Sequence, residues 1–257
     1  MILSRITRAV REQNWFAVAI EFVIVILGVV IGFQINGWAE RRDENARAAL
    51  YLDRLLADLE ANEDRFSHAF EFRQEVRDLG LQALSYASGA AEPPDDWRVI
   101  VTYFNASQAG GAEMVDATYR EMVATGDLRL LRGIELRGLL SGYYTASNFA
   151  QITNDLPDFR EHVRGIIPID LQGYIWENCW RTVDGLNQRL VDCEAPATAE
   201  PERLSALVQA LLQNTQLNAE LQYWVSNQYA ALNIHRDRIQ RTTAVVAAVR
   251  RAMELPE

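Results

Sequence analysis

Lysine is absent from this sequence of 257 residues, and all 25 of its basic residues are arginine. The absence excludes sites that need a lysine ammonium, such as the P-loop, Schiff-base catalysis and the kinase-type lysine. The chain also carries 35 acidic residues, so its formal net charge is −10. General nucleic-acid binding needs a basic surface, and we therefore expect no nucleic-acid partner.

Proline and glycine are also scarce, with 7 and 14 residues, which favours long helices. Apolar residues make up 49% of the chain, which is enough for a sizeable core and argues against a disordered protein. After residue 38 the sequence shows no strand-like alternation and no dinucleotide glycine loop, whereas helical spacing dominates. We expect an all-α fold.

One long hydrophobic run covers residues 15–38, and its centre, FVIVILGVVIGF at 22–33, is unbroken. Three polar residues interrupt the rest of the run: Glu21, Gln34 and Asn36. In a helix these 24 residues extend about 36 Å, which exceeds the hydrocarbon thickness of about 30 Å. The run therefore predicts a transmembrane helix over residues 15–38.

The flanks of the run indicate its orientation. Trp15 and Trp38 occupy the positions of interfacial anchors. Arginines outnumber acidic residues before the run, whereas acidic residues dilute Arg41 and Arg42 after it, and this bias favours a cytoplasmic N-terminus. Residues 1–14 resemble a short amphipathic helix on the cytoplasmic surface. We expect a protein of the bacterial inner membrane with residues 39–257 in the periplasm.

Two alternatives to the membrane anchor stay open. Small residues at Gly37 and Ala39 have the spacing of a signal-peptide cleavage site. The run is also long enough for a buried core helix of a soluble protein. The helical pattern continues past Ala39, and the tryptophan and arginine flanks are typical of a membrane helix, so both alternatives are less favoured.

One face of the predicted membrane helix carries small and polar residues, because four positions fall within a narrow arc at about 100° per residue: Glu21, Gly28, Gly32 and Asn36. A GxxxG pair lets a second backbone approach closely, and a carboxyl group inside a bilayer normally faces protein or water. We interpret this face as a contact with a second helix, either of the same chain or of a partner. Alternatively, Glu21 reaches the near interface and the glycines are incidental.

Beyond the run, the pattern predicts a bundle in which the outer extension of the membrane helix packs against the C-terminal helix. The first two helices that we expect cover 39–86 and the segment from the Pro-Pro-Asp-Asp signal to Ala106. A third covers 114–125 and stops at Gly126. A fourth covers 134–163 and is interrupted or ended near 154–157. Residues 168–196 are irregular and rich in aromatics. The last third is predicted to contain two helices, the second capped by Thr215.

Two cysteines, Cys179 and Cys193, are the only ones in the chain. Outside the cytoplasm such a pair suggests a disulfide, which would stabilise the irregular segment by about 3 kcal/mol. Two unlinked buried thiols are the alternative. No Cys-x-x-Cys pair exists and the three histidines are scattered, so we expect no metal site. We also expect no catalytic or cofactor-binding site.

His235 lies on the apolar seam of the last predicted helix. We interpret it as a core histidine with satisfied hydrogen bonds, or as a register-setting polar layer; a buried polar ligand contact or a pH-sensitive contact is the alternative. The aromatic run at 174–180 similarly fits a local core under a loop better than a pocket.

Two stretches carry a resemblance to a known family. The first is EFVIVILGVVIGFQINGWAERRDENARAALYLDRLLADL at 21–59, and the second is TYREMVATGDLRLLRGIELRGLLSGYY at 118–144. Together they resemble an uncharacterised bacterial family of single-pass membrane proteins, classed as a domain of unknown function. The resemblance implies an N-terminal anchor and a helical extracytoplasmic domain, and it implies no activity.

The second stretch also has two physical interpretations. One is that Tyr119 and the leucines at 128–131 pack its corner into the bundle. The other is that four side chains clamp an anionic ligand: Arg129, Arg137, Tyr143 and Tyr144. Packing is the favoured interpretation.

These observations favour a membrane-anchored helical interaction or accessory protein, a non-catalytic subunit of a larger membrane assembly. Its expected partners are the lipid bilayer and a membrane protein or a second copy of the chain. The alternative is an extracytoplasmic ligand-sensing domain that signals through a partner, because only about fourteen residues precede the predicted membrane helix. An enzyme has the least support.

Overall fold

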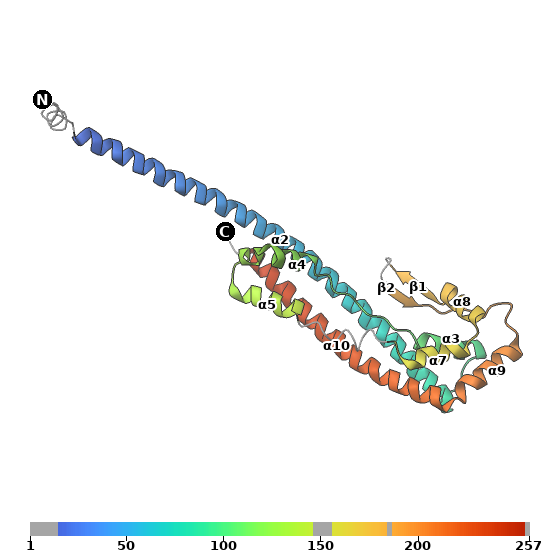
Figure 1. Cartoon of the computed structure of the whole chain (residues 1–257). Helices are drawn as coiled ribbons and strands as arrows, with labels where there is room; N and C mark the ends of the chain where they lie inside the picture. Colours follow the sequence, from blue (N-terminus) through green and yellow to red (C-terminus); the bar gives the residue numbers. More distant parts are fainter. Residues whose placement is uncertain (1–14, 146–155, 184–186, 255–257) are drawn as a thin grey trace, which may run out of the picture. The chain divides into compact units, whose positions relative to one another are not determined.

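The computed structural model describes residues 15–145, 156–183 and 187–254, with side chains from residue 19 onward (Figure 1). Within these ranges it contains eight α-helices, one 3-10 turn and two short strands, so the predicted all-α class is confirmed. The predicted amphipathic segment at 1–14 lies outside the described residues.

Helix α2 (Trp15–Ala87) includes both the predicted membrane span and its extension. The chain divides into two compact units, Met1–Tyr51 with Pro256–Glu257, and Leu52–Leu255. In the first unit the large apolar side chains of residues 20–35 are exposed to between 44% and 75%. This is the one helix among the described residues that is long and apolar enough to cross a membrane.

The helices after α2 begin and end at sequence signals. Asp95 caps α3 (Asp96–Ala106), because its side chain accepts a hydrogen bond from the backbone N–H of Arg98 at 2.7 Å. Helix α4 (Ala117–Thr125) ends at Gly126, whose φ of 76° is in the left-handed region that favours glycine. The short turn η1 (Asp127–Leu130) follows. The predicted cap and the predicted stop are both confirmed.

One prediction of local structure is confirmed in part, and two are wrong. Helices α5 (Ile134–Thr145) and α7 (Asp158–Ile166) lie on either side of the break that we expect near 154–157, and residues 146–155 between them lie outside the described residues. After α8 (Ile169–Asn178), the irregular region contains an antiparallel hairpin of β1 (Trp180–Val183) and β2 (Asn187–Leu190). Neither strand alternates between apolar and polar residues, so the sequence pattern did not indicate them. Between α9 (Pro201–Leu212) and α10 (Thr215–Glu254), Asn214 rather than Thr215 is the cap, since it accepts the N–H of Leu217 at 3.0 Å.

In the second unit, α10 lies antiparallel beside the later part of α2 (Figure 1). Contacts along the pair run from Glu60–Arg250 at 2.8 Å to Arg73–Gln228 at 3.1 Å. At Gly80 the two helices come so close that a Cβ atom would lie 2.5 Å from Val225 Cγ2. The expected packing of the extension against the C-terminal helix is thus present.

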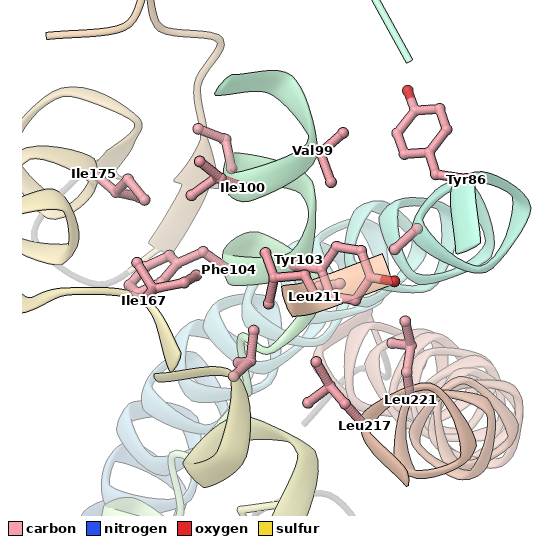
Figure 2. Close-up of a cluster of buried hydrophobic side chains, with 14 of the residues drawn as sticks. Tyr86, Val99, Ile100, Tyr103, Phe104, Ile167, Ile175, Leu211, Leu217 and Leu221 are labelled. Atoms are coloured by element: carbon pink, nitrogen blue, oxygen red, sulfur yellow. The ribbon is translucent and has the colours of Figure 1, made fainter. Parts of the chain in front are cut away.

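The core surrounds α3, whose residues from Val99 to Phe104 are almost wholly buried. Figure 2 shows this helix between Ile167 and Ile175 on one side and Leu217 and Leu221 on the other. Helices α7, α8 and α9 complete the core, since their buried residues belong to the same hydrophobic cluster.

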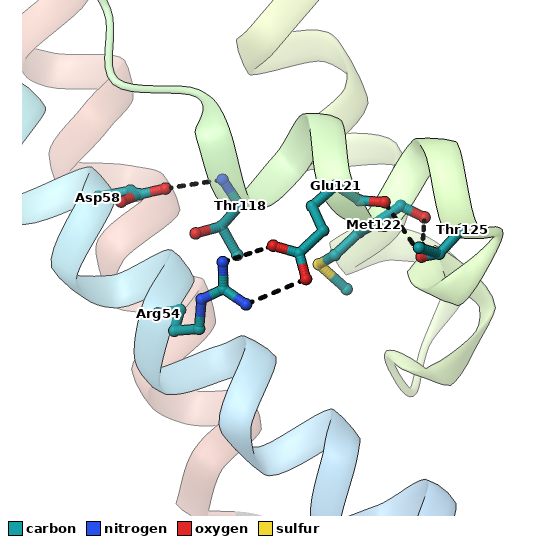
Figure 3. A network of polar contacts seen from close by, with 6 residues as sticks. All are labelled: Arg54, Asp58, Thr118, Glu121, Met122 and Thr125. Carbon is teal, nitrogen blue, oxygen red and sulfur yellow. Dashed lines mark hydrogen bonds and ion pairs between the residues drawn. The ribbon is translucent and has the colours of Figure 1, made fainter.

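Polar contacts fasten α4 to α2 (Figure 3). The Arg54 guanidinium donates two hydrogen bonds to the Glu121 carboxylate, at 3.1 and 2.5 Å. Asp58 accepts the backbone N–H of Thr118 at 3.1 Å, in the first turn of α4. The segment between α3 and α4 is therefore held against α2 where it leads into α4.

Candidate functional site

The small and polar face of the membrane-helix candidate is open. Glu21 and Asn36 are exposed, and a Cβ atom placed on Gly28 or Gly32 would meet no atom within 4 Å. A second helix can therefore approach this face without displacing any described side chain. Trp38 is also exposed, with the Arg42 guanidinium 5.6 Å from its ring centre, and the side chain of Trp15 lies outside the described residues.

Cys179 and Cys193 form a disulfide, with 5.1 Å between their Cα atoms. The bond joins the end of α8 to the segment after β2, and the Trp97 indole donates to the Cys193 carbonyl at 3.1 Å. Aromatic rings fill the space beside it, since Phe104–Trp176 and Trp176–Trp180 meet edge to face. This arrangement fits a local core at the aromatic segment.

Of the four residues in the second family-like stretch, the two tyrosines pack into the domain, whereas Arg129 is exposed and Arg137 half-buried. Tyr143 is buried and its hydroxyl lies 3.0 Å from Thr242 Oγ1, whereas Tyr144 stacks on Tyr119 with 4.5 Å between ring centres. Burial raises the pKa of both phenols, Tyr143 and Tyr144. The Arg137 guanidinium donates to the backbone carbonyl of Arg129, so it closes a turn. The geometry favours the packing interpretation.

His235 is completely buried in the seam between α2 and α10. Neither ring nitrogen has a hydrogen-bond partner among the described residues. Burial, followed by the positive charges of Arg73 and Arg238, lowers the pKa of His235 to about 3. The imidazole is therefore neutral at physiological pH, in a polar layer that includes Gln228. The predicted core position is confirmed, whereas the prediction that its hydrogen bonds are satisfied is wrong within the described residues.

Two arginines of α7, which sequence analysis did not single out, close the end of α3. Arg160 donates to the Ser107 carbonyl at 2.8 Å, and Arg164 lies over the rings of Phe104 and Trp176, at 4.6 and 5.0 Å. Burial and the charge of Arg160 lower the pKa of Arg164 to about 10. Their spacing of four residues is the only signal in the sequence.

A cavity of about 280 Å³ lies between α2, the segment after α3 and the start of β2. Sequence analysis missed it because its walls come from three segments that are far apart in the chain. The lining residues are Arg65, His68, Ala69, Phe72, Gly110, Gly111, Ala112, Glu113, Asn187 and Gln188. Positive charge, amides and an aromatic floor meet here, a combination typical of small-molecule sites.

Among the described residues no group of three or more His, Cys, Asp or Glu side chains is arranged to hold a metal ion. Comparison with protein-family models, with curated proteins and with solved structures found no match. The resemblance to a family of single-pass membrane proteins therefore stays a prediction. The function has to be argued from the chain itself.

Proposed function

We propose that this protein is a membrane-anchored helical interaction protein, a non-catalytic subunit of a larger membrane assembly. The observation that carries the proposal is the exposure of every large apolar side chain from Ile20 to Ile35. Each Å² of apolar surface left in water costs about 25 cal/mol, so a continuous apolar helix of this length favours lipid or protein around it.

The proposed topology has the N-terminus in the cytoplasm and residues 39–257 in the periplasm of a bacterium. Two observations support it. The arginine bias precedes the apolar run, and Cys179 is bonded to Cys193, as is typical of oxidising compartments.

The proposed contact surface is the face of Glu21, Gly28, Gly32 and Asn36. Lipid tails are as apolar as leucine, so helices in a bilayer associate through close packing and polar contacts rather than through hydrophobic burial. Two glycines one turn apart allow the close packing. A carboxyl group at the start of the apolar run favours a protein partner that satisfies it.

The proposal is tested by enlarging this face and the opposite face separately. Gly28→Ile with Gly32→Ile adds bulk where we expect the second helix. Val23→Phe with Val30→Phe adds bulk about 180° away, and is the matched control. In mild detergent, the glycine variant should lose a subunit from the native complex, measured by native mass spectrometry, and the control should keep it. Equal masses for wild type and the glycine variant would refute the helix contact.

Topology is tested with a membrane-impermeant thiol reagent on spheroplasts, with half-buried Cys193 as the reporter. Labelling should require prior reduction and should not require lysis. Labelling without reduction would refute the disulfide, whereas labelling only after lysis would refute the proposed topology.

The alternative function, a ligand-sensing domain that signals through a partner, is favoured by one observation, the cavity at Arg65 and Phe72.

A further inference from the structure

We propose that the cavity between α2, residues 110–113 and β2 binds a small organic anion, with its carboxylate on Arg65 and its apolar body on Phe72. This site is independent of the membrane helix. A protein with the proposed interaction function would then also respond to a soluble metabolite of this chemical class.

The floor of the cavity is one face of α2. Arg65, His68 and Phe72 follow one another at helical spacing, so their side chains project from the same side. Residues 110–113 form the opposite wall, and Asn187 and Gln188 at the start of β2 contribute two amides. A volume of about 280 Å³ is at the lower end for ligand pockets, which suits a small molecule.

The opposite wall is fixed before any ligand arrives. The buried Asn62 side chain makes two hydrogen bonds with the backbone of Val115, at 2.6 and 2.8 Å. Arg65 Nη1 donates to the carbonyl of Glu113 at 3.4 Å. Since these bonds hold the segment against α2, little ordering entropy has to be lost on binding.

Gly110 brings the backbone of this wall onto the aromatic floor. A Cβ atom at this position would lie 2.9 Å from two ring carbons of Phe72, so a larger residue would displace the ring. None of the backbone N–H groups of residues 110–113 donates to a described residue. These groups are therefore free to donate to a bound ligand.

The charges favour a singly charged ligand. Within the described ranges, no carboxylate lies within 4 Å of the half-buried Arg65 guanidinium, whereas Arg203 on the surface pairs with Asp170. A guanidinium forms strong, geometrically specific hydrogen bonds with a carboxylate. Glu113 adds one negative charge to the lining, which disfavours a doubly charged phosphate.

The test uses the full chain in nanodiscs, with empty nanodiscs as the blank, and probes that differ only in their polar group. The probes are isovalerate, its amide and the corresponding amine, together with inorganic phosphate. Their dissociation constants are measured by ligand-observed NMR. Isovalerate should bind with a Kd of about 1 mM, as expected for so small a ligand, and at least ten times more tightly than the other three.

Arg65→Gln should reduce the affinity for isovalerate to that of the amide, and Arg65→Lys should lie between the two. Arg77→Gln, on the same helix but paired with Asp78, is the matched control and should bind like the wild type. Gly110→Ala should abolish binding while the melting temperature shows that the domain is folded.

Four results would overturn the proposal. These are no binding of isovalerate at about 10 mM, equal affinity for acid and amide, an unchanged Kd in Arg65→Gln, or tighter binding of phosphate than of isovalerate. Arg65 also donates a hydrogen bond to the Glu113 carbonyl, so Arg65→Gln removes both the positive charge and this contact. Arg65→Lys keeps the charge, and it therefore distinguishes the loss of charge from the loss of the contact that holds residues 110–113.

Discussion

Two stretches of the same helix, α2, illustrate two ways in which apolar residues are used. Between Ile20 and Ile35 the large apolar side chains surround the helix and all are exposed. Between Leu55 and Val76 they form one stripe, which is buried against the rest of the domain. A helix that is apolar all round requires an apolar solvent, whereas a striped helix provides one wall of a core. Folding therefore leaves the apolar stretch from Ile20 to Ile35 uncovered.

The largest expected difference comes from the same substitution in the two regions. Leu221→Ala, in the core and fully buried, should lower the free energy of unfolding by about 2–5 kcal/mol. Leu27→Ala, 53% exposed in the apolar stretch, should leave the domain's unfolding unchanged. Denaturant titration of the full chain in detergent, followed by fluorescence of buried Trp97 and Trp224, measures both. A similar loss in both variants would show that the apolar stretch belongs to the domain's core.

The disulfide should be the next largest contribution. Replacing Cys179 and Cys193 together by alanine should destabilise the domain by about 3 kcal/mol, because the unfolded chain then loses a closed loop. The same denaturant titration measures the change. A loss of less than about 1 kcal/mol would mean that the packing of Trp97 and its neighbours holds this segment without the bond.

Acid should weaken the domain through His235. Its pKa is about 3 in the folded chain and close to 6.5 when unfolded, so between these values the unfolded state binds more protons. The stabilising contribution of neutral His235 is therefore complete above pH 6.5. It decreases as the pH falls, and the free energy of unfolding drops by about 2 kcal/mol between pH 6.5 and 5. Unfolding free energies measured across this range in wild type and His235→Leu give the effect, and the variant should have the flatter profile.

His162 provides the control for this experiment. It is exposed, and its hydrogen bond to Glu220 raises its pKa, so its contribution is present at low pH and is lost as the pH rises. His162→Gln should keep the loss of stability in acid. If His235→Leu has the same acid slope as the wild type, the histidine is not the group responsible.

The smallest expected effect is that of the Arg54–Glu121 pair between α2 and α4. Both side chains are about 40% exposed, and exposed pairs contribute about 0.2–1 kcal/mol. A double-mutant cycle of Arg54→Gln and Glu121→Gln measures the coupling. A coupling energy well above this range would show that the pair is less accessible to water than the exposed fractions of the two side chains indicate.

The sequence predicted the parts of the fold that depend on local chemistry. The cap at Asp95 and the stop at Gly126 require only nearby residues, and both are confirmed. The helix expected over 39–86 is also present as part of α2, where Leu55, Leu59 and Phe66 are buried and Leu52 and Phe70 half-buried. The hairpin was missed because its four-residue strands depend on Cys179, α3 and each other rather than on periodicity.

The candidate sites also differ in whether local sequence alone predicts them. The open face of Gly28 and Gly32 follows from spacing on one helix, so the sequence alone located it. The cavity at Arg65 was not predictable, because Gly110 and Asn187 approach α2 only in the folded domain. His235 lay on the predicted seam, yet its burial between Arg73 and Arg238 needs both helices in register.

The most direct test of the account is alkaline extraction of membranes from cells that express the full chain, followed by the intact mass of the protein in the pellet. Residues 15–38 should hold the protein in the pellet, with the mass of an uncleaved chain. Release into the supernatant, or a mass that lacks the residues up to about position 39, would contradict the anchor. It would mean that the apolar run is a leader or part of a soluble core.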